Sequence, residues 1–153
     1  MTNNEIKHML QMDEGVQLHA YYDPMHVLTV GVGRNLEVSP GLNILHRKIK
    51  LGDSITQAEA EALLEEDIDR VLSALRKQIA NFNSLPERYQ KVLINMSFQL
   101  GTNGIMKWHD MLYAMSQGKD DDIIKAIKDS HYYHQCTNRA NRMIQLIQGT
   151  NPY

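Results

Sequence analysis

Two carboxylates and a hydroxyl lie close together in the run DEGVQLHAYYDPMHVLTVGVGR at residues 13–34. Glu14 is followed nine positions later by Asp23, and Asp23 six positions later by Thr29. Hydrolysis of a glycosidic bond needs such groups, because one carboxyl must protonate the leaving oxygen while an ionised carboxylate stabilises positive charge or activates water. The three residues are therefore a candidate site for cleaving a carbohydrate.

Each of these residues also has an ordinary structural interpretation. In that interpretation Asp23 before Pro24 forms a turn, Thr29 reflects the preference of threonine for strands, and Glu14 beside Gly15 is a solvated helix end. The neighbouring GVGRNL lacks the third glycine of a dinucleotide-binding loop, which disfavours a nucleotide site. Residue type and spacing leave the structural and the catalytic interpretations open.

The elements that would position these groups form a β-hairpin. Residues 16–22 and 28–33 alternate apolar with polar or glycine residues, which predicts two strands joined by a turn at Asp23-Pro24. Alternation places Thr29 on the same face as Gly31 and Gly33. We expect that face to be bare of side chains, so that a bulky ligand can lie against it.

The rest of the chain has mainly helical patterns. Helices are predicted over residues 3–12, 57–78, from Ser84-Leu85-Pro86-Glu87 to Gly101, and over 104–116, 120–129 and 138–148. Thr56 and Glu59 fit a capping box at the start of the long helix. The fold class is α+β. We expect a β-containing N-terminal lobe at 13–56, a connecting helix at 57–78 and a helical C-terminal lobe at 79–153, against which the helix at 1–12 packs.

Composition excludes several functional classes. The chain has 153 residues and a formal charge of -2, so no strong attraction to nucleic acid or to an acidic membrane is expected. Its single cysteine, Cys136, allows no internal disulfide and gives no metal-site spacing. The N-terminus does not have the pattern of a signal peptide, so we expect the product to accumulate in the cytoplasm of the cell that makes it. No cofactor or metal is indicated.

Taken together, the motifs resemble the lysozymes of T-even phages, in glycoside hydrolase family 24. The resemblance rests on Asp-Glu-Gly, Tyr-x-Asp and Thr-Val-Gly-Val-Gly in the quoted run, and on ITQAEAEALLEEDI at 55–68, INMSFQLG at 94–101 and SHYYHQCTNRANR at 130–142. It extends over nearly the whole chain, in order. It implies a lysozyme-like fold and an inverting mechanism, with Glu14 as general acid, Asp23 as the second carboxylate and Thr29 as the hydroxyl that holds the attacking water.

The resemblance also assigns supporting residues. Arg139 matches an arginine that pairs with the catalytic glutamate, and Phe98 and Gln99 match residues that line the saccharide cleft. For Phe98, a core aromatic is an equally good interpretation. Asp67 corresponds to an aspartate that pairs with a histidine in the family. That histidine is replaced by Arg34 here, which can keep the ion pair as a permanent cation.

Two further positions depart from the family. Met111 and Ala126 stand where relatives have cleft residues, and their side chains offer no comparable hydrogen bonds. The slightly acidic chain also contrasts with the basic character of the best-known member, which weakens steering towards an anionic wall. These departures affect wall affinity and peptide preference, and they leave Glu14, Asp23 and Thr29 intact.

The activity that the resemblance implies is that of a muramidase acting on the β-1,4 bond between N-acetylmuramic acid and N-acetylglucosamine of peptidoglycan, for host cell lysis. We expect a monomer that needs a holin to pass from the host cytoplasm to the wall. The alternatives are a catalytically degenerate peptidoglycan-binding protein, a lytic transglycosylase, which needs no water-activating carboxylate, and a tail-associated lysozyme domain. The apparent lack of flanking assembly segments favours a free endolysin.

Overall fold

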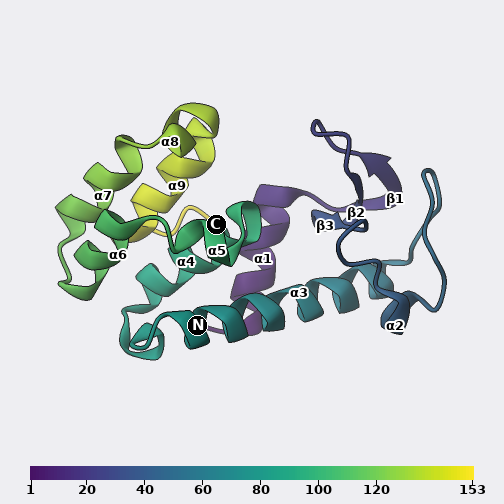
Figure 1. The fold of residues 1–153 in the computed structure, drawn as a ribbon, viewed down its shortest axis with the longest axis horizontal. Coiled ribbons are helices and arrows are strands. Elements are labelled where there is room, and N and C mark those ends of the chain that lie inside the picture. Colours follow the sequence, from purple (N-terminus) through teal and green to yellow (C-terminus); the bar gives the residue numbers. More distant parts are fainter. The chain divides into compact units, whose positions relative to one another are not determined.

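The computed structural model describes residues 1–153, which divide into two compact units. One unit is Thr2–Arg70, and the other is Val71–Tyr153 together with Met1. The boundary falls inside the long helix α3, Gln57–Gln78, whose bounds are those predicted (Figure 1). The N-terminal helix groups with the β-containing unit, and its predicted packing against the helical lobe stays a prediction.

The first unit contains a small antiparallel sheet. Its elements are α1 (Asn3–Glu14), β1 (Gln17–Tyr22), β2 (Leu28–Gly31), β3 (Arg34–Asn35), α2 (Leu42–Leu45) and the first part of α3. The strand order is β1-β2-β3, with Tyr21 directly opposite Thr29. Residues 52–55 bond to the other edge of β1, where Ile55 N–H donates to the Leu18 carbonyl at 2.8 Å. The predicted hairpin is therefore the centre of a wider sheet.

The core of this unit is built from apolar residues of the sheet, α2 and α3. Its buried members are Ala20, Val30, Leu36, Leu45, Ile49, Ile55, Ala60 and Leu63. Ala20 and Val30 occupy the apolar positions of the alternating strands. Tyr21 and Thr29 therefore lie on the opposite face of the sheet, away from this core. Burial of this face fixes the register that brings Tyr21 opposite Thr29.

The expected bare glycine face is wrong. The returning strand ends at Gly31, and both Gly31 and Gly33 have positive φ, +66° and +64°, so the chain turns into β3 instead of continuing to residue 33. The Gly31 backbone lies in the core, where a Cβ would be 3.7 Å from Ile55 Cδ1. The glycines therefore turn the backbone and do not expose a strand face to a ligand.

The start of α3 confirms the predicted capping box. Glu59 N–H donates to Thr56 Oγ1 at 3.0 Å, and Thr56 N–H donates to Glu59 Oε1 at 3.0 Å. Arg47 donates to both oxygens of the Glu59 carboxylate, at 2.8 and 3.1 Å. The Arg47 hydrogen bond, together with the backbone N–H, lowers the pKa of Glu59 to about 2. This carboxylate is held in its ionised form for structural reasons.

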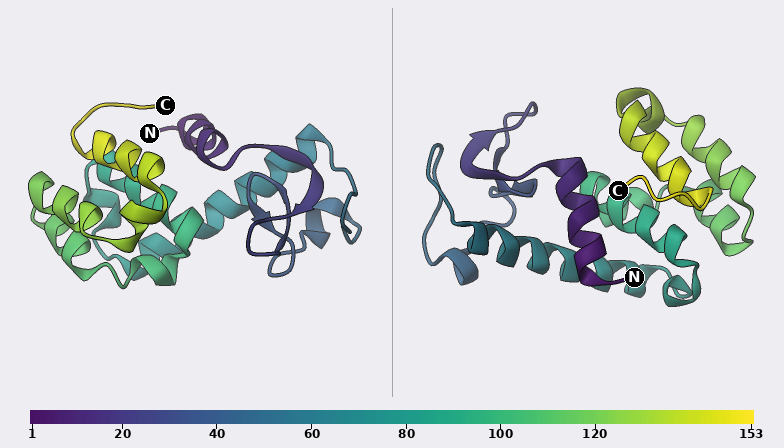
Figure 2. Two further views of the ribbon diagram at one scale, coloured as in Figure 1. Left: turned by 90° about the horizontal axis from the view of Figure 1, so that it is seen from above. Right: turned by 180° about the vertical axis from the view of Figure 1, so that it is seen from behind.

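The second unit is helical and is organised around α4. Its elements after α3 are the 3₁₀ turn η1 (Phe82–Ser84), α4 (Glu87–Leu100), α5 (Thr102–Ile105), α6 (His109–Ser116), α7 (Asp120–Lys128), α8 (His131–Gln135) and α9 (Thr137–Ile147). Helix α4 packs against α5 and α9, α9 packs against α7 and α8, and α6 packs against α7 (Figure 2). None of the helices combines the length and the apolar character needed to cross a bilayer.

The single helix predicted over 104–116 is wrong, because the chain forms α5 and α6 with a break between them. Trp108 leaves helical geometry, with φ -83° and ψ 62°, and its ring packs edge-on against Tyr132 at 5.8 Å between centroids. Gly104 lowers the helix propensity just before the break. The packing of Trp108 is a tertiary effect that sequence periodicity does not reveal.

Candidate active site

Glu14 is the last residue of α1, and its carboxylate lies against the backbone of Gly33. The helix ends at Gly15, which has φ +72° and donates its N–H to the Gln11 carbonyl at 2.9 Å. A Cβ at position 33 would lie 2.9 Å from Glu14 Oε2, closer than real Cβ contacts allow. The glycine at 33 therefore leaves room for the carboxylate of Glu14 at the end of α1.

Asp23 is fixed by the turn between β1 and β2. Its Oδ1 accepts the N–H groups of Met25 at 2.9 Å and Val27 at 2.8 Å. Its backbone carbonyl accepts the N–H of His26 at 2.8 Å, and His26 adopts the left-handed conformation with φ +62°. No protein group bonds to Oδ2. The turn thus immobilises the carboxylate through one oxygen and leaves the other open.

Thr29 is held by the same residue that holds Asp23. Its Oγ1 donates to the carbonyl of Val27 at 2.8 Å, and the residue is only 5% exposed. Because its proton is used in that bond, the hydroxyl can act towards a ligand only as an acceptor. Val27 therefore orients Asp23 through its N–H and Thr29 through its C=O.

The charges of both Glu14 and Asp23 act on the phenol of Tyr21. Burial, then the negative charges of Glu14 and Asp23, raise the pKa of the Tyr21 phenol above its ordinary value. Both carboxylates thus act on one side chain, and that side chain is directly opposite Thr29 on the neighbouring strand. Asp23 and Thr29 are joined through Val27. Tyr21, which the sequence interpretation gave no role, pairs with Thr29 and responds to the charges of Glu14 and Asp23. The position of Tyr21 on the polar face of an alternating strand is the sequence feature that could have indicated such a role.

Comparison with known proteins agrees with this arrangement. The model of the family described as phage lysozyme matches residues 11–142. The chain belongs to the phage lysozyme family. A probable T4-type lysozyme of Dictyostelium discoideum is 31% identical, covering 95% of this chain and 94% of that protein. A second one from the same organism is 26% identical, with the same coverage. The pre-baseplate central spike protein Gp5 of Enterobacteria phage T4 is 30% identical over 95% of this chain, which spans 28% of that protein.

Arg34, which the resemblance aligns with a histidine, forms a buried ion cluster. It is 4% exposed, and its Nη1 donates to Asp67 Oδ1 at 2.9 Å. Its Nη2 donates to Glu66 Oε1 at 2.8 Å, and its Nε donates to the Ser39 carbonyl at 2.8 Å. Hydrogen bonds from Asn43 and Arg34 lower the pKa of Glu66. The expected pair with Asp67 is present, and Glu66 is a partner that sequence reasoning missed.

The remaining predicted residues lie in the helical unit. Arg139 Nε donates to Asn95 Oδ1 at 2.9 Å, in a buried contact between α9 and α4. Gln99 Nε2 lies 3.1 Å from Cys136 Sγ, and Gln99 Oε1 is buried without a hydrogen-bond partner. Phe98 is half-buried. The predicted pairing of Arg139 with the catalytic glutamate, and the substrate-binding roles of Phe98 and Gln99, stay predictions.

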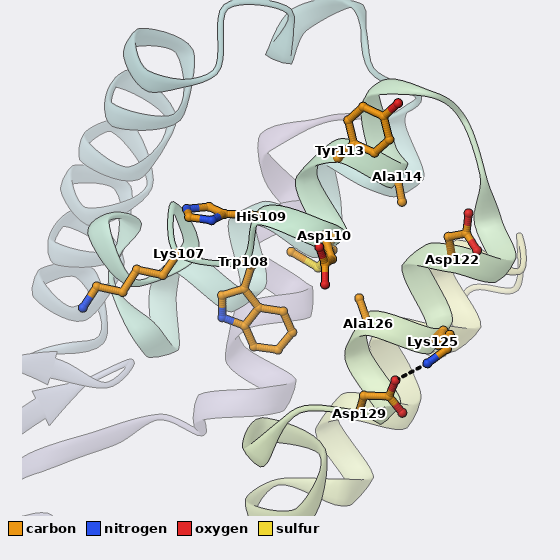
Figure 3. A pocket seen from close by; sticks show the side chains of 11 residues that line it. Lys107, Trp108, His109, Asp110, Tyr113, Ala114, Asp122, Lys125, Ala126 and Asp129 are labelled. Carbon is orange, nitrogen blue, oxygen red and sulfur yellow. Dashed lines mark hydrogen bonds and ion pairs between the residues drawn. The ribbon is translucent and has the colours of Figure 1, made fainter.

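Met111 and Ala126 line a pocket between α6 and α7, with a volume of about 600 Å³. Figure 3 shows Trp108 at one side of this pocket and the ion pair between Lys125 and Asp129, at 2.5 Å, at another. Met111 is fully buried. Met111 and Ala126 offer no polar side chain to this pocket, so its polar groups come from other lining residues such as Asp110 and Lys125. Across the chain, no group of three or more His, Cys, Asp or Glu side chains is arranged to hold a metal ion.

Proposed function

We propose that this chain is an inverting muramidase, which hydrolyses the β-1,4 bond between N-acetylmuramic acid and N-acetylglucosamine in peptidoglycan. Membership of the phage lysozyme family supports peptidoglycan as the substrate. The observation that carries the mechanism is the double use of Val27, which orients Asp23 and Thr29 through one residue's backbone. Two such groups fixed side by side are suited to hold a single water molecule.

The attacking water donates its protons to acceptors that the turn has prepared. Thr29 Oγ1 can only accept, because its own proton is bonded to Val27, and the open Oδ2 of Asp23 accepts as well. With both hydrogens directed to the protein, a lone pair of the water faces the anomeric carbon. Asp23 takes the water's proton as the new C–O bond forms.

Glu14 acts on the other side of the bond as general acid. Its carboxyl donates a proton to the glycosidic oxygen, which leaves with the bonding electron pair. An inverting enzyme places its two carboxyl groups about 6.5–9.5 Å apart so that a water fits between sugar and base. Here the two carboxyl groups come from separate elements, Glu14 from the end of α1 and Asp23 from the turn between β1 and β2.

Two other activities could use the same fold. A lytic transglycosylase needs an acid but no water-activating pair, so the fixed Asp23 and Thr29 would have no task in it. A degenerate binding protein would need none of the three groups. The loss of polar side chains at Met111 and Ala126 favours weaker wall binding, and it does not remove the groups that act on the bond.

Mass analysis of digested bacterial sacculi tests the proposal. We expect wild-type protein to release muropeptides with a free reducing end, and Glu14→Gln to fold and release almost none. Anhydro ends would show transglycosylation. Intact sacculi with bound protein would show a binding module. A Glu14→Gln variant with near-normal release would remove Glu14 from the mechanism.

For the biological setting we propose host cell lysis by an endolysin that acts as a monomer. It would wait in the host cytoplasm until a holin permeabilises the membrane. The similarity to the T4 central spike protein supports a second setting, a lysozyme domain that acts on the wall from a phage tail. The two relatives from Dictyostelium discoideum show that similar chains also occur outside phages.

Expression in a Gram-negative bacterium separates the first setting from the others. We expect cultures producing the chain to stay turbid until a holin is co-expressed or chloroform is added, and then to clear. Sedimentation at micromolar concentration should give a single species of 17.6 kDa. Clearing without permeabilisation, or assembly into a larger complex, would contradict the endolysin model.

A further inference from the structure

Tyr21 belongs to the candidate site, and the proposed chemistry has not used it. It is half-buried on β1 and pairs directly with Thr29 on β2, so the two side chains emerge on the same face of the sheet. Glu14 and Asp23 are close enough for their charges to act on its phenol. Its hydroxyl makes no hydrogen bond to any protein group, which is unusual for a half-buried tyrosine.

The attacking water has one requirement that Asp23 and Thr29 cannot meet. Water makes up to four hydrogen bonds in a tetrahedral arrangement, two as donor and two as acceptor. Its hydrogens go to Thr29 Oγ1 and to Asp23 Oδ2, and one lone pair attacks the anomeric carbon. The second lone pair needs a donor, yet the proton of Thr29 is engaged by Val27 and an ionised Asp23 has none.

We propose that Tyr21 is this donor, and that its phenol completes the coordination of the attacking water and so orients the lone pair that forms the bond. In the reaction the water oxygen bonds to the anomeric carbon, one water proton passes to Asp23, and the glycosidic oxygen leaves with its electron pair and the proton of Glu14. Tyr21 keeps its own proton throughout. The raised pKa of the phenol agrees with this role, since the hydroxyl stays protonated over the neutral range. This inference rests on the proposed hydrolytic function.

The neighbouring Tyr22 provides a matched control. It lies on the opposite face of β1, is 45% exposed, and stacks on His26 with 4.1 Å between ring centroids. Tyr21→Phe and Tyr22→Phe remove the same atom from adjacent positions of one strand. Both keep the aromatic ring, so packing should change little in either variant.

The experiment measures kcat, KM and the pH profile on soluble, uncrosslinked peptidoglycan strands for wild type, Tyr21→Phe, Tyr22→Phe and Glu14→Gln. For Tyr21→Phe we expect kcat to fall about 5- to 10-fold, the value of one neutral hydrogen bond, with KM and both limbs of the pH profile unchanged. Tyr22→Phe should match wild type. Unfolding curves should show that both variants are folded at the assay temperature.

Several results would overturn the inference. An unchanged kcat would mean that the phenol does not touch the water. A raised KM at constant kcat would make Tyr21 a sugar-binding residue, and a shifted pH limb would mean that it acts through a carboxylate. A loss of kcat explained by partial unfolding would make its role structural. If Glu14→Gln stays active, the proposed function itself fails, whereas an inactive Glu14→Gln beside a normal Tyr21→Phe rejects this inference alone.

Discussion

Asp23 and Asp67 lie in the same unit of this molecule, yet their surroundings differ in a way that separates chemistry from stability. Asp67 is buried and receives hydrogen bonds from two arginines, Arg34 and Arg70. Asp23 is half-buried and receives only backbone N–H groups, both on the same oxygen. One carboxylate is neutralised by side chains, while the other is oriented by the backbone and keeps one oxygen open.

The difference shows how a single unit can hold a reactive carboxylate beside inert ones. A carboxylate paired with arginine has its charge compensated and its lone pairs occupied, so it contributes to folding and not to proton transfer. Backbone amides can orient a carboxylate without placing a positively charged side chain beside it. The turn therefore orients the carboxylate of Asp23, whereas Arg34 compensates the charge of Asp67.

Replacing each aspartate by the neutral asparagine is the sharpest test of this comparison. For Asp23→Asn we expect kcat to fall about 10³-fold, or about 4 kcal/mol, because the amide oxygen keeps both backbone bonds but cannot take the water's proton. The free energy of unfolding should hardly change. Asp67→Asn should show the reverse, with lower stability and a near-normal kcat per folded molecule. Equal effects of the two variants on kcat would contradict the division.

Removal of the buried cation should give the next largest effect. Arg34→Met leaves the buried Asp67 with Arg70 alone and removes the bonds to Ser39 and Glu66, so we expect a loss of about 3 kcal/mol in the free energy of unfolding. Chemical denaturation measures it. Arg70→Met is the control, because Arg70 bonds to the same carboxylate but is 52% exposed, and should cost less than about 1 kcal/mol. Similar losses in both variants would mean that burial does not decide the strength of this cluster.

Two glycines of the same turn allow the fit of Glu14 to be tested. Gly33→Ala and Gly31→Ala carry similar backbone strain, at φ +64° and +66°. A Cβ at 33 would meet Glu14 Oε2 at 2.9 Å, whereas the nearest atom to a Cβ at 31 is 3.7 Å away. Both variants should lose about 1–2 kcal/mol of stability, and Gly33→Ala should lose about 10-fold more in kcat. Equal kcat values would show that the carboxylate of Glu14 can move without consequence.

Sequence reasoning located the elements and the reacting groups because both depend on local patterns. The alternation of residues 16–22 predicted β1, and helical spacing with a capping box predicted both ends of α3. The residues Glu14, Asp23 and Thr29 followed from type and spacing, and the family resemblance supplied their roles. These features are encoded within short stretches of chain.

The features that sequence reasoning missed depend on backbone geometry and tertiary contacts. Val27 has an apolar side chain, so nothing in its type indicates that its N–H and C=O orient two polar groups. Strand alternation predicts a bare face at Gly31 and Gly33, although positive φ turns the chain at that point. Strand β3 has two residues and α8 has five, too short for a period to appear. Trp108 interrupts a helical pattern for a packing reason.

The smallest effect is expected at a third carboxylate, Glu59, and it extends the comparison to pH. Arg47 and the backbone of Thr56 lower the pKa of Glu59 from an ordinary 4.5 to about 2. A carboxylate whose folded pKa is lowered stabilises the fold above pH 4.5 and loses that contribution as the pH falls to about 2. Glu59→Gln should therefore lose less than about 1 kcal/mol at pH 7, because the pair lies at the surface, and nothing relative to wild type near pH 2. Thermal unfolding at pH 7, 4, 3 and 2 measures the difference.

Glu61→Gln is the control, because Glu61 is an exposed neighbour without a hydrogen bond, and its effect on stability should not change with pH. A loss of stability in Glu59→Gln that is independent of pH would mean that the capping geometry matters more than the charge.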